Sequence, residues 1–177
     1  GTWVVCTEGA KQMIKEGHGG AIVMVSSISA HVGAPTQTAY CGTKGAISML
    51  GKALGAVLGG HGIRVNVIEP GAVATNMSAP LLDAAPEVLK YYLDRIALHR
   101  IGDPSELASA IAFMLSDDAS YVTSATLLVD AGFIVNTLAL PPDTPVLDLR
   151  RRGGHHAIRL AQRGYRVGGG ADGDGSR

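Results

Sequence analysis

Apolar residues along the chain follow two patterns, helical stripes and short continuous runs. Near the start they recur on one helix face and stop at the glycine-rich residues 17–20, which predicts a helix near residues 2–15. A second stripe, ended by a pair of glycines, predicts a long helix near residues 40–58. These stripes indicate helices that each bury one side.

Three continuous apolar runs, rich in β-branched residues, lie at residues 21–26, 63–68 and 126–129. Such runs are typical of strands buried on both faces, as in parallel sheets. Helices alternating with these strands predict an α/β fold, a layered parallel sheet with right-handed crossovers. Ligands in such sheets bind at the carboxyl ends of strands, where Ser27 and residues 71–75 lie.

The region between the second and third strands has one clear helix start. Asp103 is a favourable N-cap, Pro104 suits the first helical position, and Glu106 completes a capping pattern. Residues 75–100 are mixed in character, and we expect one or two short helices there.

Composition narrows the class of protein. The chain has 177 residues, 46% of them hydrophobic, and its fifteen basic and fifteen acidic residues cancel. This balance argues against nucleic acid or an anionic membrane as a partner, and no apolar run is long enough to span a bilayer. Cys6 and Cys41 lie in no metal-ligand spacing. We therefore expect no metal, free thiols and a cytoplasmic protein.

The composition changes after Asn136. Residues 139–177 are rich in glycine and arginine, and we expect a flexible or irregular tail after a folded domain over residues 1–138. An arginine-rich arm over residues 150–166 is an alternative that would bind nucleic acid. The aspartates mixed into the tail and the lack of interleaved aromatic residues favour disorder.

Ser27, Tyr40 and Lys44 are candidates for proton-transfer chemistry. Tyr40 and Lys44 are four residues apart and share a helix face, and Ser27 lies at the end of a strand. A nearby ammonium group favours the deprotonated phenol, so this tyrosine can exchange a proton with a substrate oxygen. The serine hydroxyl can hold the same oxygen. The set suits hydride transfer between an alcohol carbon and a nicotinamide, although a tyrosine at a helix start is often only a packed aromatic residue.

Five motifs together resemble the C-terminal half of a short-chain dehydrogenase/reductase, over residues 1–136. Two serines end a strand, and Tyr-x-x-x-Lys follows thirteen residues after the second. An Asn-x-x-x-Pro-Gly-x-x-x-Thr segment follows at residues 66–75, then Arg-x-Gly-x-Pro-x-Glu at 100–106 and a matching last strand at 128–132. The resemblance implies an incomplete, doubly wound, Rossmann-like sheet.

The resemblance also implies roles for individual residues. Ser27 would orient the substrate oxygen, Tyr40 would be the general acid/base, and Lys44 would stabilise the phenolate and bind the nicotinamide ribose. Substrate contacts are expected from Ser27, Ser29 and Gln37, whereas His31 is interpreted as a solvent-facing loop residue. The cofactor-binding residues implied by the family are Tyr40, Lys44, Pro70, Gly71, Val73 and Thr75. Residues 76–100 would form a mobile lid over the substrate.

The cofactor implied is NAD or NADP, and the substrate is a small alcohol or ketone such as a sugar, a polyol or a 3-oxoacyl compound. The family's glycine-rich cofactor turn belongs to an N-terminal half that we expect to lie outside this chain. Residues 153–156 do not reproduce that turn. The resemblance implies a homodimer or homotetramer for the full-length form. The alternative hypothesis is a truncated, non-catalytic remnant that keeps this half of the fold and its oligomer surface.

Overall fold

A computed structural model describes residues 1–34, 36–79 and 86–136, all within the first of two units, Gly1–Thr137 and Leu138–Arg177. These residues form a parallel sheet of three strands in the order β1-β2-β3. β1 is Gly20–Val25, β2 is Ile63–Pro70 and β3 is Thr126–Val129. β1 pairs with β2 along the whole of β1, starting with Gly20 opposite Ile63. β3 pairs with the second half of β2, starting with Thr126 opposite Val67.

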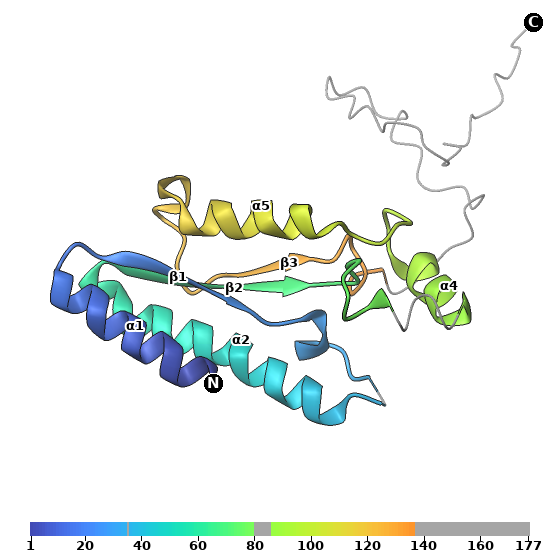
Figure 1. Cartoon of the computed structure of the whole chain (residues 1–177), viewed down its shortest axis with the longest axis horizontal. Helices are drawn as coiled ribbons and strands as arrows, with labels where there is room; N and C mark the ends of the chain where they lie inside the picture. Colours follow the sequence, from blue (N-terminus) through green and yellow to red (C-terminus); the bar gives the residue numbers. More distant parts are fainter. Residues whose placement is uncertain (35, 80–85, 137–177) are drawn as a thin grey trace, which may run out of the picture. The chain divides into compact units, whose positions relative to one another are not determined.

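Helices cover both faces of the sheet. Figure 1 shows α1 (Thr2–Glu16) and α2 (Thr38–Leu58) together on one face and α5 (Pro104–Leu115) on the other. α4 (Pro86–Arg95) lies beyond the ends toward which the strands point (Figure 1). The short 3₁₀ turns are η1 (Ile28–Ala30), η2 (Gly59–His61) and η3 (Asp117–Ala119). This arrangement confirms the predicted α/β parallel sheet, doubly wound as in Rossmann-like folds.

Local sequence signals explain where helices begin and end. α1 ends at Gly17, whose φ of 77° is left-handed and whose amide bonds back to the Met13 carbonyl. α5 begins with a capping box: the Asp103 side chain accepts from the Ser105 amide, and the Glu106 side chain accepts from the Asp103 amide. The predicted helix start at Asp103 is therefore confirmed.

The core is centred on β2. Ile63, Val65, Val67 and Ile68 are fully buried in this middle strand, with helices on either side. One hydrophobic cluster joins β1 and β2 to α1 and α2 and includes Cys6, Ala10, Met24, Leu54, Leu58, Ile63, Val65 and Val67. A second cluster joins η1, the residue after α4 and the segment after β3 through Ile28, Ile96 and Phe133.

Two glycines let α2 lie close to its neighbours. A Cβ at Gly51 would overlap the Val67 side chain on β2 and come within 2.9 Å of Met24 Cε on β1. A Cβ at Gly55 would overlap Ser124 in the segment before β3. The distance between α2 and the sheet therefore depends on both positions having no side chain.

Two sequence expectations need comment. β2 extends through Glu69 to Pro70, past the predicted end at residue 68, because Pro70 is the last residue to pair with β3. The expected tail over residues 139–177 lies outside the described residues, as do residues 80–85 of the expected lid. Within the described ranges no helix is both long enough and apolar enough to cross a membrane.

Candidate active site

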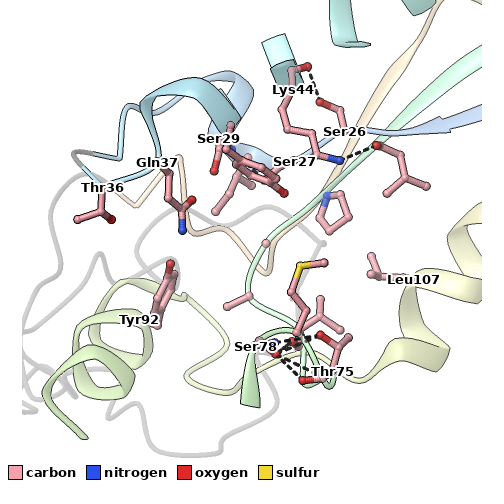
Figure 2. Close-up of a pocket in the computed structure, with 18 of the residues that line it drawn as sticks. Ser26, Ser27, Ser29, Thr36, Gln37, Lys44, Thr75, Ser78, Tyr92 and Leu107 are labelled. Carbon is pink, nitrogen blue, oxygen red and sulfur yellow. Dashed lines mark hydrogen bonds between the residues drawn. The ribbon is translucent and has the colours of Figure 1, made fainter. Parts of the chain in front are cut away.

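A cavity of about 1000 Å³ lies at the carboxyl ends of β1 and β2. Its wall comes from the loop after β1, the first turns of α2, the segment after β2, and side chains of α4 and α5 (Figure 2). The structure brings every sequence-predicted site residue to this one cavity: Ser27, Ser29, Gln37, Tyr40, Lys44, Pro70, Gly71, Val73 and Thr75. Residues from three separate stretches of the chain therefore line one cavity.

Tyr40 and Lys44 lie one turn apart near the start of α2. The Lys44 ammonium is 5.5 Å from the centroid of the Tyr40 ring, close enough for a cation–π contact. It also donates to the Val25 carbonyl at 3.0 Å, at the end of β1 (Figure 2). The Tyr40 side chain is 40% exposed, so its hydroxyl can be reached from the cavity. The cation is thus fixed beside the phenol.

The two serines after β1 point to different partners. Ser27 is buried at the cavity, and its Oγ accepts from the Ser29 amide at 3.1 Å, which caps η1. That contact leaves the Ser27 hydroxyl proton free for another acceptor. Ser26 also lines the cavity, but its hydroxyl donates to the Lys44 carbonyl at 2.7 Å (Figure 2). Ser27 therefore keeps a hydroxyl proton for a substrate, and Ser29 lines the cavity beside it.

The end of β2 forms an apolar floor. The Gly71 amide donates to the Val129 carbonyl at 3.0 Å, and a Cβ at Gly71 would come within 2.7 Å of Asp130 Cα. Glycine is therefore required for β2 and β3 to end this close together. Val73 is buried and pairs with Gly102, which ties the segment after β2 to the start of α5.

Thr75 and Ser78 form a compact hydroxyl turn at the lower edge of the cavity in Figure 2. Ser78 Oγ donates to the Val73 carbonyl at 2.6 Å and accepts from the Thr75 amide at 2.9 Å. The two side-chain oxygens are 3.2 Å apart. The turn presents hydroxyl groups to a polar ligand beside the apolar floor.

Some cavity residues were missed in the sequence. Tyr92 on α4 and Leu107 on α5 both line the cavity, as do Thr36 and Met77. The Tyr92 ring packs 5.5 Å from the Phe133 ring, and burial, followed by the nearby Tyr91, raises the pKa of Tyr92. The adjacent tyrosines after Pro86 were the available signal, because aromatic residues are prominent in binding walls.

The cavity has two chemically different sides. The floor at Pro70 and Gly71 is apolar, and the Lys44 ammonium and the Thr75 hydroxyl lie at its margins. This combination fits a flat ring that carries an amide and a ribose, as a nicotinamide does. Ser27 and Tyr40 offer hydroxyl groups to a substrate oxygen. Gln37, at the start of α2, and Tyr92, on α4, also point into the cavity (Figure 2).

Comparisons with known proteins find similar sequences among dehydrogenases. A sequence model described as enoyl-(acyl carrier protein) reductase matches residues 1–134. The chain is 44% identical over 137 residues to an L-rhamnose 1-dehydrogenase (NAD(P)(+)) of a Sphingomonas species, covering 77% of this chain and 53% of that protein. The chain spans about half the length of the curated relatives it matches.

Solved structures show the same similarity. A short-chain type dehydrogenase/reductase from Mycobacterium ulcerans matches with a TM-score of 0.72 and 34% identity, over 76% of this chain and 48% of that one. A crystal structure of an Agrobacterium tumefaciens protein with bound NADP matches with a TM-score of 0.68 and 32% identity. That match covers 71% of this chain and 51% of the other.

Proposed function

The chain belongs to the short-chain dehydrogenase/reductase family, and we propose that it carries the catalytic half of an NAD(P)-dependent oxidoreductase. The reaction is the reversible conversion of a secondary alcohol to a carbonyl compound. The observation that carries the proposal is the convergence of Ser27, Tyr40 and Lys44 on one cavity beside an apolar floor.

Each residue of this set has a step that its position allows. The nicotinamide, when bound, accepts or supplies the hydride at the carbinol carbon. In the oxidation direction, the Tyr40 oxygen takes the hydroxyl proton of the alcohol, and in reduction it returns a proton to the carbonyl oxygen. The Ser27 hydroxyl hydrogen-bonds the same substrate oxygen. The Lys44 ammonium, held by the Val25 carbonyl, stabilises negative charge on the phenol.

The residues present fit the nicotinamide end of the cofactor. Pro70, Gly71 and Val73 provide the surface for the ring, and Lys44 and Thr75 provide donors for the ribose and the carboxamide. NAD and NADP are both candidates, because two curated relatives, including the L-rhamnose 1-dehydrogenase above, are named for use of either. Choice between them needs residues that read the ribose 2′ position, and the family resemblance assigns that role to the N-terminal half of the fold.

We assign the substrate to the sugars and polyols. Four of the relatives are L-rhamnose dehydrogenases by name, and others are named for cyclopentanol or 2-(S)-hydroxypropyl-CoM. Ser29, Gln37 and Tyr92 line the cavity with hydrogen-bonding groups beyond the reacting oxygen, which suits a polyhydroxylated substrate better than a hydrocarbon.

The experiment is a comparison of two tyrosine variants. Steady-state oxidation of L-rhamnose and other sugars with NAD⁺ and NADP⁺ should fall roughly a hundredfold or more in kcat for Tyr40→Phe. Tyr121→Phe is the matched control, because Tyr121 is fully exposed and absent from the cavity. Calorimetric titration with NADH separates this function from the non-catalytic remnant, which predicts no binding. Full activity in Tyr40→Phe would refute the assignment.

Assembly into a homodimer or homotetramer is part of the same proposal. Four large apolar side chains on α1 and α2 are 57–73% exposed, namely Trp3, Val5, Met49 and Val57. Exposed apolar groups on two adjacent helices are typical of surfaces that another subunit covers. Sedimentation equilibrium should show self-association that Val57→Glu weakens, and an unchanged monomer in both chains would contradict it.

A further inference from the structure

One glutamate is enclosed beside the cavity. Glu69 is the penultimate residue of β2, directly before Pro70, and its side chain has no solvent exposure. Its two oxygens have different partners: Oε1 accepts from Ser48 Oγ at 2.5 Å, and Oε2 bonds with His31 Nε2 at 2.5 Å. A buried carboxyl group is costly unless such bonds satisfy it, so Ser48 and His31 offset the cost of burying Glu69.

The Ser48 side of this network reaches α2 and β1. Ser48 Oγ is 2.8 Å from Ser26 Oγ, and Ser26 in turn donates to the Lys44 carbonyl. A hydroxyl group has one proton, so Ser48 gives its proton either to the Glu69 carboxyl group or to Ser26, while Ser26 gives its own to the Lys44 carbonyl. The chain of bonds therefore ties the ends of β1 and β2 to the turn of α2 that carries Lys44.

The His31 side reaches the loop between β1 and α2. His31 is the residue that ends η1, four residues after Ser27, and its amide bonds to the Ile28 carbonyl. The next residue, Val32, accepts a weak bond from Cys41 Sγ at 3.8 Å, beside Tyr40 on α2. The expectation of a solvent-facing loop residue is thus incomplete, because the His31 side chain is 44% exposed but its inner nitrogen is bonded to a buried group.

We propose that Glu69 and His31 are positioning residues that hold the Ser27 loop, residues 27–31, in a fixed place relative to Tyr40. Neither side chain needs to touch the substrate. Glu69 holds His31, His31 holds the end of η1, and η1 begins at the Ser27 cap. The catalytic consequence rests on the proposed function: a loop that drifts by about 1 Å would misplace the Ser27 hydroxyl and cost as much as a hundredfold in rate.

The central variant is His31→Ala, and backbone hydrogen exchange is measured in the 177-residue chain. The backbone amides of Ser29, Ala30 and His31 should exchange roughly tenfold faster or more. In this variant, local opening of the loop no longer has to break the hydrogen bond between His31 and Glu69. Amides in β2 should keep their protection, which shows that the fold is intact. His31→Gln, whose amide can reach Glu69 in the place of Nε2, should restore protection.

Two controls define the result. His18→Ala removes a histidine that bonds to Glu16 at 3.2 Å on the exposed surface, and it should leave exchange in the loop unchanged. Should His31→Ala lose protection in β2 as well, His31→Asn repeats the test with a polar side chain too short to reach Glu69. Unchanged loop protection in a folded His31 variant, or no rescue by glutamine, would overturn the inference.

Kinetics then separate this inference from the proposed function. In an active enzyme, His31→Ala should lower kcat about tenfold while the dissociation constant for NADH stays within about twofold, since Lys44 and the β2 floor are untouched. Loop opening with no cofactor binding in any variant would leave the positioning role standing and reject the function. Loop opening in an active enzyme with kcat unchanged would reject the catalytic consequence.

Discussion

Glu69 and Glu106 use the same side chain in opposite surroundings. Glu106 is 44% exposed at the start of α5, where Arg100 grips it with two bonds of 2.6 and 2.7 Å and the Asp103 amide adds a third. Glu69 is fully enclosed at the end of β2 and has a hydroxyl group and an imidazole in place of a guanidinium. An exposed carboxylate that is paired with a permanent cation also remains in contact with water, so it depends little on further hydrogen-bond partners in the protein.

The difference concerns how each region is held. The Glu106 network is local, with every partner within six residues, and it organises one helix start. The Glu69 network joins residues 21 and 38 positions away and organises the meeting of three elements at the cavity. Removing a hydrogen-bond partner of Glu69 should therefore lower both the stability and the activity. Removing a partner of Glu106 should mainly change the pKa of the Glu106 carboxyl group.

The largest expected effect is on the buried side. Ser48→Ala removes a donor from a fully buried carboxyl group and should lower the free energy of unfolding by about 1–3 kcal/mol. Ser109→Ala is the matched control, since Ser109 also lies inside a helix and donates to the carbonyl four residues earlier, but at an exposed position. Its effect should be within about 0.5 kcal/mol. Urea denaturation followed by circular dichroism measures both, and equal losses would contradict the contrast.

A smaller effect is expected on the exposed side, and it depends on pH. The side-chain bond from Arg100, followed by the Asp103 amide, lowers the pKa of Glu106 from 4.5 to about 2. A carboxyl group with a depressed folded pKa stabilises the fold above about pH 4.5, and that contribution is lost as the pH falls toward about 2. Arg100→Met should raise the pKa of Glu106 toward 4.5, so less stability should be lost between about pH 4.5 and about pH 2.

Carbon-detected NMR of the Glu106 carboxyl group checks the titration, and thermal melts across the same pH range check the stability. Arg95→Met is the control, because the Arg95 guanidinium stacks 4.0 Å from the Tyr91 ring and has no contact with Glu106. An unchanged Glu106 titration in Arg100→Met would show that the backbone amide, rather than the cation, sets its pKa.

The same contrast explains what the sequence could predict. The start of α5 was predictable because Asp103, Pro104 and Glu106 act on one another within a few residues. The strands were predictable because continuous apolar runs fit a sheet covered on both faces. The arrival of the predicted site residues at one cavity follows from the parallel topology, which brings the carboxyl ends of neighbouring strands together.

The buried network could not be predicted in this way. A glutamate just before Pro70 is expected at a strand end facing water, and nothing near it in the sequence indicates a partner. Its burial depends on Ser48 facing the sheet from α2 and on His31 folding back from η1. Tyr92 was missed for a related reason: its place in the cavity wall depends on packing against Phe133, forty-one residues later.

The close seating of α2 at Gly51 has a consequence for reading activity screens. Any side chain there would collide with Val67 and Met24, and α2 carries Tyr40 and Lys44 at its other end. A larger residue at Gly51 would therefore tilt the helix and change the distance from Tyr40 to Ser27. A map of mutational tolerance would then mark Gly51 as intolerant of substitution although it does not line the cavity. A Gly51 variant that kept its fold but lost activity would show that the tilt of α2, rather than a contact with a ligand, causes the loss.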